Sequence, residues 1–425
     1  MKRFSRYFCA LVLTLLAGVS CSSPFATPGR TVLAPTPLSI AYGKHVEHSN
    51  LNEEELRKSV PVFICSSRNL APHDDRVDPF GNKRSDELVP YLAMAEVSIG
   101  KNTTPDVVLV ETRNVVKRKK TKVKMESITM FESPKLTPFS SSEEKKREFG
   151  SNAWLKRMAV EMKHSKRKEL TVFVHGYNTS LVENTELLGE MYHYAGRQGA
   201  VVNYEWPSAG KLLGYFKDKG NAEHSTRMFR SFVSRVGQMT GAESVRIIAH
   251  SAGNPIVVNA LKELRLINKD LSPKQLLEKY KITQVVLAAP DMDSMRFMNA
   301  VFDRFFEMAT NVTVYAYPKD KALAVSGKLF GTNRVGSALD KLTDWEKAAL
   351  KQATNLQMVD VTVPQSQYGS LLGHGYFHRD PWVSSDILLG GNTPNAVERG
   401  LVKSVDGLFW EFTEDYPERL EALKR

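Results

Sequence analysis

The sequence has little cysteine, with three residues of this type among 425, at Cys9, Cys21 and Cys65. Cys9 lies in an apolar N-terminal segment of the kind that is removed on export, and Cys21 stands at its exit. If that segment is removed and Cys21 is modified, Cys65 is left single and no internal disulfide can form. A disulfide framework is therefore excluded, and the fold has to rest on a hydrophobic core, which a chain of this length can build.

Long hydrophobic runs and cofactor motifs are also missing. The apolar stretch from Tyr7 to Ala17 is too short to cross a bilayer comfortably. The sequence contains no glycine loop that cradles phosphate and no dinucleotide fingerprint, and His374 and His378 lack the H-E-x-x-H context of a zinc helix. We therefore expect no cofactor and no catalytic metal.

The N-terminus has the three parts of a signal peptide, namely basic residues, an apolar stretch and small residues that lead to Cys21. We assign residues 1–20 to a signal peptide that takes the chain across the inner membrane. Cys21 after the small residues resembles the lipobox of bacterial lipoproteins, although Gly18 stands where that motif usually has leucine. The resemblance implies acylation of Cys21 and a membrane-anchored protein of the periplasm or cell envelope, with plain secretion as the alternative.

The charge is positive and locally concentrated. The formal net charge is +11, and the signal peptide carries three basic residues, so the mature chain is near 11 − 3 = +8. Much of the excess lies in one run, R-N-V-V-K-R-K-K-T-K-V-K, at residues 113–124. Because no aromatic residues interleave with this run, we expect no nucleic-acid partner. We interpret it as a solvated basic hairpin, with anionic lipid headgroups as an alternative contact.

Strand and helix patterns alternate along most of the chain, which predicts an α/β fold with a mostly parallel sheet covered by helices on both faces. Outside the strand before Ser251, the predicted strands are 60–65, 95–99, 121–130, 170–174, 200–206, 281–289, 311–317 and 358–363. We predict five parts after this pattern: the signal peptide 1–20, a flexible leash 21–50, an N-terminal addition 51–150 that contributes the first strands of the sheet, an α/β core 151–390 and a C-terminal helical tail 391–425.

The stretch from Ser244 to Leu264, S-V-R-I-I-A-H-S-A-G-N-P-I-V-V-N-A-L-K-E-L, carries the main functional signal. Its first half is apolar and β-branched, and its second half has apolar residues at the spacing of one helix face. Ser251 therefore occupies the turn from a strand to a helix, in a G-x-S-x-G pattern with Ala249 at the first glycine. Such a turn holds the hydroxyl clear of the sheet, near the positive end of a helix. We predict that Ser251 is a nucleophile.

Catalysis by serine needs a base and an acid that orients the base, and in this class of sheet the chain order is Ser, acid, His. Ser251, Asp320 and His374 follow that order, each just past a predicted strand, where active residues of parallel sheets collect. We favour His374 as the base over His378, because the glycines on both sides of His374 give its loop freedom to approach the serine.

The chain order leaves two candidates for the acid and does not identify the oxyanion donors. Asp320 follows the strand where the acid usually stands, and Asp291, which follows the preceding strand, stays open as the alternative acid. Asp291 also fits a helix N-cap. The backbone N–H groups of Ala252 and Tyr177 are the predicted oxyanion donors, since Gly176 allows the loop of Tyr177 to come close to the serine.

Linked motifs in a fixed order resemble an uncharacterised bacterial branch of the α/β-hydrolase superfamily, a domain of unknown function. The motifs are V-F-V-H-G-Y-N, N-Y-E-W-P-S-A-G, I-I-A-H-S-A-G-N, V-V-L-A-A-P-D-M-D, V-Y-A-Y-P-K-D-K-A-L and G-H-G-Y-F. The resemblance extends from about Val60 to Leu389 and implies an α/β-hydrolase fold and a serine-hydrolase mechanism. By this resemblance Ser251 is the nucleophile, His374 the base, Asp320 the acid, and Tyr177 and Ala252 the oxyanion donors. It implies no substrate.

These features together predict an exported, lipid-anchored serine hydrolase that cleaves carboxylic esters. We expect its substrate to be a small-molecule or lipid ester, or an acylated envelope component, and its membrane contact to be the acyl group on Cys21. Two alternatives use the same residues or the same fold: an acyltransferase, and an envelope binding or scaffold module without turnover.

Overall fold

The computed structural model describes residues 31–42, 59–71, 78–87, 89–100, 121–133, 141, 143, 152–208, 215–368 and 373–423. Within these residues a 12-stranded sheet runs through the whole molecule. Its strands are β1 (Thr31–Val32), β2 (Val60–Ser66), β5 (Tyr91–Ile99), β6 (Lys122–Phe131), β7 (Glu169–Val174), β8 (Ala200–Glu205), β9 (Ser244–His250), β10 (Ile282–Ala288), β11 (Asn311–Ala316), β12 (Leu356–Asp360), β13 (Val402–Lys403) and β14 (Trp410–Glu411). A separate two-stranded sheet pairs β3 (Arg68–Leu70) with β4 (Phe80–Arg84).

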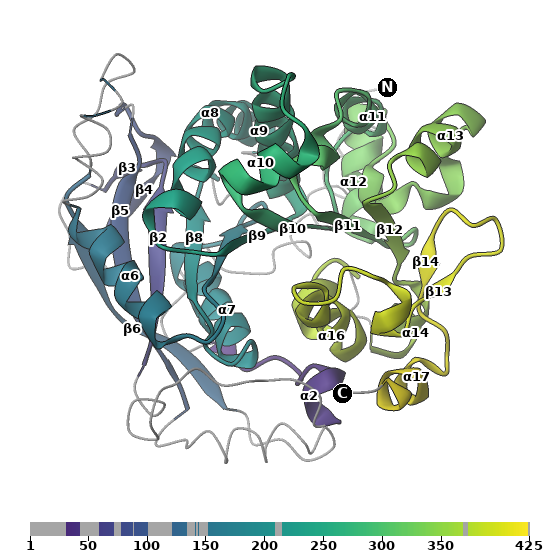
Figure 1. Cartoon of the computed structure of the whole chain (residues 1–425), viewed down its shortest axis with the longest axis horizontal. Helices are drawn as coiled ribbons and strands as arrows, with labels where there is room; N and C mark the ends of the chain where they lie inside the picture. The colour runs from purple at the N-terminus through teal and green to yellow at the C-terminus, as the bar shows by residue number, and fades with distance from the viewer. Residues whose placement is uncertain are drawn as a thin grey trace, which may run out of the picture.

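The centre of the large sheet is parallel and its edges are antiparallel. The strand order is β1-β6-β5-β2-β8-β7-β9-β10-β11-β12-β14-β13. Neighbours from β2 to β14 pair in parallel, whereas β5, β6 and β1 at one edge and β13 at the other pair antiparallel. The strands from the first part of the chain form the left edge in Figure 1. The predicted mostly parallel sheet is thus confirmed.

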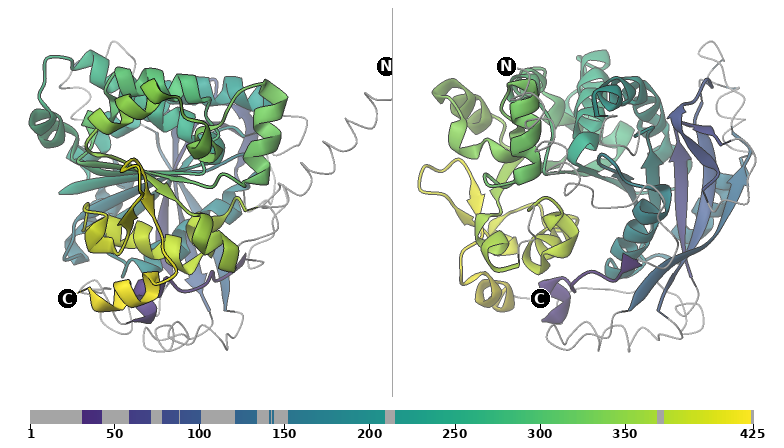
Figure 2. Two further views of the ribbon diagram at one scale, coloured as in Figure 1. Left: turned by 90° about the vertical axis from the view of Figure 1, so that its right-hand side faces the viewer. Right: turned by 180° about the vertical axis from the view of Figure 1, so that it is seen from behind.

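Helices cover both faces of the sheet, as the edge-on view in Figure 2 shows. Over one face pack α6 (Ala153–His164), α8 (Tyr215–Met239), α9 (Asn254–Ile267), α10 (Pro273–Tyr280), α11 (Ser294–Phe302) and α13 (Asp344–Gln352). Over the other pack α2 (Leu38–Ala41), α7 (Leu181–Tyr194), α14 (Thr362–Tyr368), α15 (Tyr376–Arg379), α16 (Pro381–Gly390) and α17 (Tyr416–Ala422). Helix α12 (Lys321–Phe330) follows β11.

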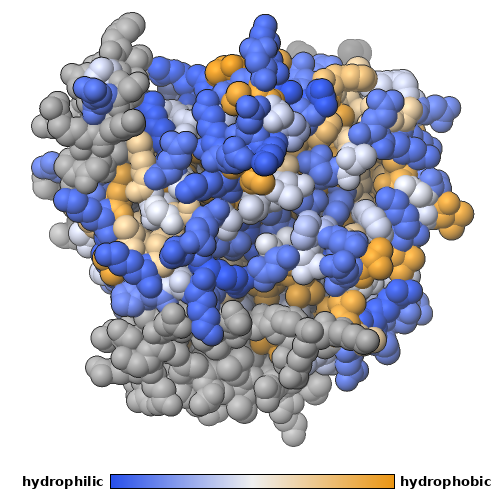
Figure 3. Space-filling view, in the orientation of Figure 1, coloured by the Kyte–Doolittle hydropathy of each residue, from blue (hydrophilic) through white to orange (hydrophobic). Residues whose placement is uncertain are grey.

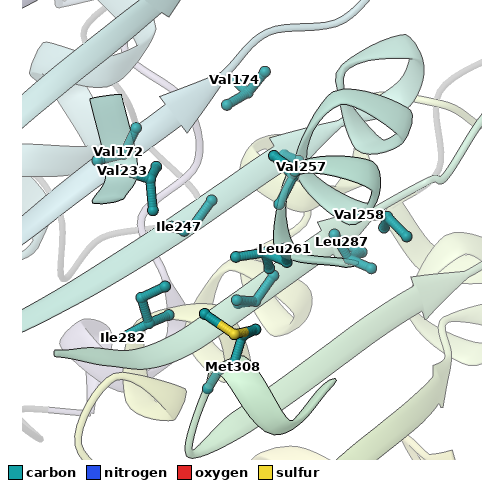
Figure 4. Close-up of a cluster of buried hydrophobic side chains, with 14 of the residues drawn as sticks. Val172, Val174, Val233, Ile247, Val257, Val258, Leu261, Ile282, Leu287 and Met308 are labelled. Atoms are coloured by element: carbon teal, nitrogen blue, oxygen red, sulfur yellow. The ribbon is translucent and has the colours of Figure 1, made fainter. Parts of the chain in front are cut away.

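The central strands are mainly apolar because each is buried on both faces. Side chains alternate along a strand, so Val172 and Val174 of β7 join the core beneath α8 and α9, whereas Phe173 joins the opposite core. Figure 4 shows the first of these cores, where Val257 and Leu261 of α9 face the strands. Each such side chain contributes about 1.5–3 kcal/mol by leaving water. This burial holds the strand ends rigidly in place.

Three segments differ from the sequence-based expectation. In the expected leash 21–50, residues 31–42 form β1 and α2, and Ile40 is buried against the core of α16; the rest of the leash lies outside the described residues. Strands β3 and β4 lie between the predicted strands 60–65 and 95–99, where no strand was predicted. The expected helical tail ends in α17, but it first adds β13 and β14 to the sheet. These elements are short and depend on distant partners, which a local pattern does not reveal.

The outer surface is mainly hydrophilic on the face drawn in Figure 3, where apolar residues are scattered in small groups. None of the helices in the described part of the chain combines the length and the apolar character that a membrane span requires. The predicted signal peptide and Cys21 lie outside the described residues, as does most of the basic run at 113–124.

Candidate active site

A strained turn presents Ser251 at the end of β9. The residue has φ of +51°, a left-handed backbone that costs non-glycine residues of order 1 kcal/mol or more. It opens the short 3-10 helix η2 (Ser251–Gly253), which continues into α9. The Ser251 carbonyl accepts hydrogen bonds from Asn254 Nδ2 at 2.8 Å and from the backbone N–H of Asp291 at 3.2 Å. These bonds hold the turn in a conformation that the chain would otherwise avoid.

Close packing of the turn on β7 explains the last glycine of the G-x-S-x-G pattern. A Cβ atom on Gly253 would lie 2.5 Å from the carbonyl oxygen of His175 and 2.7 Å from that of Val174. Both are backbone atoms, so a larger residue would force the turn away from β7, and glycine avoids this cost. At the first position, Ala249 is fully buried in the same core. The sequence pattern and the nucleophile-elbow geometry therefore agree.

The structure brings together three of the predicted site residues. His374 Nε2 lies 2.8 Å from Ser251 Oγ, and His374 Nδ1 lies 2.7 Å from Asp320 Oδ2. Each residue stands beyond the carboxyl end of a different strand, on a loop after β9, β11 or β12. All three are buried, with Asp320 fully inaccessible to solvent. A hydroxyl, an imidazole and a carboxylate in this sequence of contacts can pass a proton from serine to histidine.

The alternative acid, Asp291, is engaged elsewhere. Its Oδ1 accepts a hydrogen bond from Ser326 Oγ at 2.7 Å and lies 3.3 Å from Nε of the buried Arg334. Asp291 is not the N-cap of the next helix either, because the Asp293 side chain caps α11. Of the two candidate acids, the structure thus places Asp320 against His374, while Asp291 contributes a nearby negative charge.

The electrostatics of the site favour protonation of His374. Burial by itself lowers the pKa of His374, but the charge and hydrogen bond of Asp320, with a smaller contribution from Asp291, raise it above its usual value. Asp320 is itself held in place, because its Oδ1 accepts the N–H of Leu323 at the start of α12, at 3.0 Å. A basic imidazole with a fixed orientation is what a general base requires.

Two other histidines near the site have different environments. Burial and the neighbouring His374 lower the pKa of His250 well below its usual value, so its Nε2–H is that of a neutral ring and donates to the His374 carbonyl at 3.1 Å. His250 also stacks on Phe377, with ring centroids 4.6 Å apart. Burial and Arg379 lower the pKa of His378 to about 3. It is His374, rather than the competing candidate His378, that contacts Ser251.

The predicted oxyanion donors lie in two segments that border Ser251. Ala252 follows Ser251 in η2, at the start of the α9 region. Gly176 lies against Ser251, since a Cβ atom on it would stand 3.0 Å from Ser251 Cβ and 2.9 Å from His250 Nδ1. Tyr177 is the next residue of that loop. The role of Tyr177 and Ala252 as oxyanion donors stays a prediction, and the closeness of Gly176 to Ser251 is consistent with it.

Sequence reasoning missed the groups that support the site. Asn254 ties the Ser251 carbonyl to that of Ala288 on the neighbouring strand, through Nδ2 bonds of 2.8 Å and 3.1 Å. Arg334 neutralises Asp291 from a segment with no recognisable motif. Only Asn254 had a usable signal, because it lies directly after the G-x-S-x-G pattern. Within the part of the chain that the structure describes, no three His, Cys, Asp or Glu side chains cluster closely enough to hold a metal ion.

Several known proteins are similar to parts of this chain. It is 30% identical over 82 residues to an uncharacterised protein of Nostoc sp. (strain PCC 7120), a match that covers 19% of this chain and 21% of that protein. The chain therefore spans about a fifth of the length of that relative.

Among solved structures, it is similar to esterase B of Lactobacillus rhamnosis (HN001), with 10% identity, a TM-score of 0.31 and coverage of 54% of this chain and 76% of that one. It is also similar to a lipase-esterase related protein of Clostridium acetobutylicum ATCC 824, with 12% identity, a TM-score of 0.25 and coverage of 50% and 90%. At these TM-scores the likenesses carry no argument about fold or function.

The family comparison is more informative, because it covers more than half of the chain and includes the whole candidate site. Residues 150–391 match the family described as alpha/beta hydrolase of unknown function (DUF900). The order of strands and the turn at Ser251 agree with that description. The chain thus belongs to the DUF900 family of α/β hydrolases, whose function is unknown.

Proposed function

We propose that the protein is a serine hydrolase that cleaves carboxylic esters through an acyl-enzyme on Ser251. One observation carries the proposal, namely the pair of contacts at 2.8 Å and 2.7 Å that link Ser251 to His374 and His374 to Asp320. These contacts occur at a nucleophile turn in a chain of the α/β-hydrolase family. Membership of the family supports hydrolysis in general, and the serine chemistry is our inference from the contacts.

The mechanism follows from the position of each group. Ser251 Oγ attacks the ester carbonyl carbon while its proton moves to His374 Nε2, and Asp320 stabilises the imidazolium that forms. The oxyanion of the tetrahedral intermediate accepts hydrogen bonds from the N–H groups of Tyr177 and Ala252. His374 then protonates the departing alcohol. Water attacks the acyl-enzyme with His374 again as the base, and this step releases the acid and regenerates Ser251.

Turnover of chromogenic esters tests this proposal. The purified protein is assayed against p-nitrophenyl esters of graded acyl length, beside Ser251→Ala and His374→Ala. Ser234→Ala, which removes the hydroxyl of a partly buried serine on α8, is the matched control. We expect the two site variants to lose turnover and the control to keep it. A folded parent protein that hydrolyses no ester would favour a scaffold role, and an acyl product that appears only with an added alcohol would favour acyl transfer.

We propose in addition that the protein is exported and anchored to a membrane by an acylated Cys21, where it acts on a lipid ester or an acylated envelope component. The support is the signal-like segment 1–20 and the cysteine at its exit. The test is fractionation of cells that express the parent chain or Cys21→Ala. The variant is expected to move from the membrane to the soluble fraction, and an unchanged distribution would contradict the anchor.

A further inference from the structure

A line of buried polar side chains connects the first part of the chain to the loop of Tyr177. Arg68 comes from β3, Glu205 is the last residue of β8, and His175 follows β7. Arg68 Nη2 lies 2.6 Å from Glu205 Oε2, and the same oxygen lies 3.3 Å from His175 Nε2. The side chains of all three are at most 5% exposed. The mechanism proposed above uses none of them.

Glu205 is held as a charged carboxylate in one orientation. Its Oε1 accepts hydrogen bonds from Asn184 Nδ2 at 2.9 Å and Asn203 Nδ2 at 2.8 Å, while Arg68 meets the other oxygen. Burial alone raises the pKa of Glu205, but Arg68, His175 and Asn184 together lower it to about 2. Arg68 also donates from Nε to the Trp206 carbonyl at 3.1 Å. Buried charges of this kind cost free energy unless paired, and the pairing fixes their geometry.

His175 contacts both Glu205 and the peptide that joins Gly176 to Tyr177. Its Nε2 lies 3.2 Å from the backbone nitrogen of Trp206, beside its 3.3 Å contact with Glu205 Oε2. Its carbonyl accepts Trp206 Nε1–H at 2.8 Å, and the two rings are stacked 13° from parallel. Its Nδ1 lies 2.8 Å from the Gly176 carbonyl oxygen, a contact that requires the hydrogen on Nδ1. Thr179 Oγ1 donates to the same oxygen at 3.4 Å. The Gly176 carbonyl is therefore directed toward His175.

The direction of that carbonyl determines the direction of the next N–H. The peptide unit between Gly176 and Tyr177 is planar, and no described peptide bond is cis, so the carbonyl of Gly176 and the N–H of Tyr177 point to opposite sides. Gly176 also packs against Ser251, with 3.0 Å between its hypothetical Cβ and Ser251 Cβ. A rotation of this one peptide would redirect the Tyr177 N–H, which the proposed mechanism assigns to the oxyanion.

We propose that Arg68, Glu205 and His175 are positioning residues that fix the Gly176–Tyr177 peptide as an oxyanion donor, with Arg68 supplied from outside the α/β core. This inference rests on the proposed function and deepens it. The role is one of orientation: the ester touches none of the three side chains. Loss of the Arg68 charge leaves Glu205 unpaired, lets the His175 ring reorient and releases the peptide. The defect should then appear in the transition state, where the oxyanion exists, and not in substrate binding.

The experiment compares Arg68→Met, Glu205→Gln and the double variant with the parent protein. We measure kcat and KM for the best p-nitrophenyl ester, and the inhibition constant of a trifluoromethyl ketone that forms a tetrahedral oxyanion on serine. Removal of an oxyanion donor lowers kcat about 10²–10³-fold. We expect mispositioning to lower it roughly tenfold to a hundredfold, with KM within about threefold. The inhibition constant should rise in parallel with the fall in kcat/KM.

A buried pair elsewhere in the chain provides the matched control. Arg265 Nε lies 2.8 Å from Glu307 Oε2, with side chains 11% and 7% exposed, near the end of α9 that is remote from Ser251. Arg265→Met and Glu307→Gln should lower the melting temperature without changing kcat of the folded protein. If Arg68→Met fails to fold, the Arg68→Met/Glu205→Gln protein, which buries no unpaired charge, carries the test.

Two results would overturn the inference. One is a folded Arg68 or Glu205 variant with the parent kcat; the other is a fall in kcat with no change in the inhibition constant of the ketone. A parent protein that neither turns over esters nor binds the ketone would instead refute the proposed function. Arg68→Lys keeps the positive charge but loses the Nε donor to the Trp206 carbonyl, so we expect kcat between those of the parent protein and Arg68→Met.

Discussion

At the scale of single residues, Asp320 has two roles that can be separated by one substitution. Its Oδ2 meets His374 Nδ1, and its Oδ1 caps α12 through the N–H of Leu323. Asparagine keeps an oxygen for the cap but cannot orient the correct imidazole tautomer. We expect Asp320→Asn to lower kcat by about 10³–10⁴-fold with little change in melting temperature. Steady-state kinetics and thermal unfolding measure the two effects.

The matched substitution is Asp291→Asn, because Asp291 was the other candidate acid from the sequence. It leaves Arg334 buried without its charge partner, which should cost about 3–5 kcal/mol of stability. The folded variant should nevertheless keep kcat within roughly tenfold of the parent value. Asp291 pairs with Arg334 and does not contact His374, so its loss lowers stability more than it affects proton transfer from Ser251 to His374. An equal loss of kcat in the two variants would contradict the assignment of Asp320.

The pH profile tests the environment of His374. The base works only as the neutral ring, so kcat/KM falls as pH drops through the pKa of His374. Since Asp320 and, more weakly, Asp291 outweigh burial and raise that pKa, the acid limb should have its midpoint above 6.5. Asp291→Asn removes one of the raising charges and should move the midpoint downward. A parent midpoint below 6.5, or an upward shift in the variant, would show that the electrostatics are assigned incorrectly.

At the scale of elements, the turn between β9 and α9 depends on close packing against β7. Gly253→Ala places a methyl group 2.5 Å and 2.7 Å from the backbone oxygens of His175 and Val174, at the end of β7. We expect a loss of about 1–3 kcal/mol in the free energy of unfolding, measured by denaturant titration, because β7 and the turn must separate. Gly375→Ala is the control, since φ there is −98° and its Cβ would meet nothing closer than 3.7 Å. Equal losses would argue against this packing.

The same scale explains which elements the sequence could predict. Strands β2, β7 and β9 are rich in apolar and β-branched residues, so their signal is local. Elements such as β1 and α2 have two and four residues, and they exist because of distant partners, including the bond from the Ser39 N–H to Ser385 Oγ.

The residues of the candidate site could also be predicted only where their signal is local in the sequence. Ser251 and His374 stand out through their turn and glycine context, whereas Asp320 and Asp291 both follow strands. The choice between them depends on Arg334 and Ser326, which pair with Asp291 only in three dimensions. His175 and Glu205 lie in two of the linked motifs, but Arg68 lies in none of them, and no local pattern indicates that the three side chains meet.

At the scale of the whole molecule, residues 31–42 pack against helices near the C-terminal end of the described chain. Helix α2 packs on α16 and α17, and the Ala34 N–H donates to Glu190 Oε2 on α7 at 2.6 Å. A chain that begins at residue 43 loses the burial of Leu33 and Ile40, and we expect it to be less stable by at least about 3 kcal/mol than one that begins at residue 31. Thermal unfolding of the two proteins measures the difference. Equal melting temperatures would show that this segment only rests on the surface.

The central claim is that Ser251 is an activated nucleophile, and covalent labelling tests it most directly. The folded protein is treated with a fluorophosphonate, and the adduct is located by intact mass and peptide mapping. We predict one adduct per chain, on Ser251, which is lost in Ser251→Ala and forms much more slowly in His374→Ala. A folded parent protein without an adduct, or an adduct that persists in Ser251→Ala, would contradict the claim.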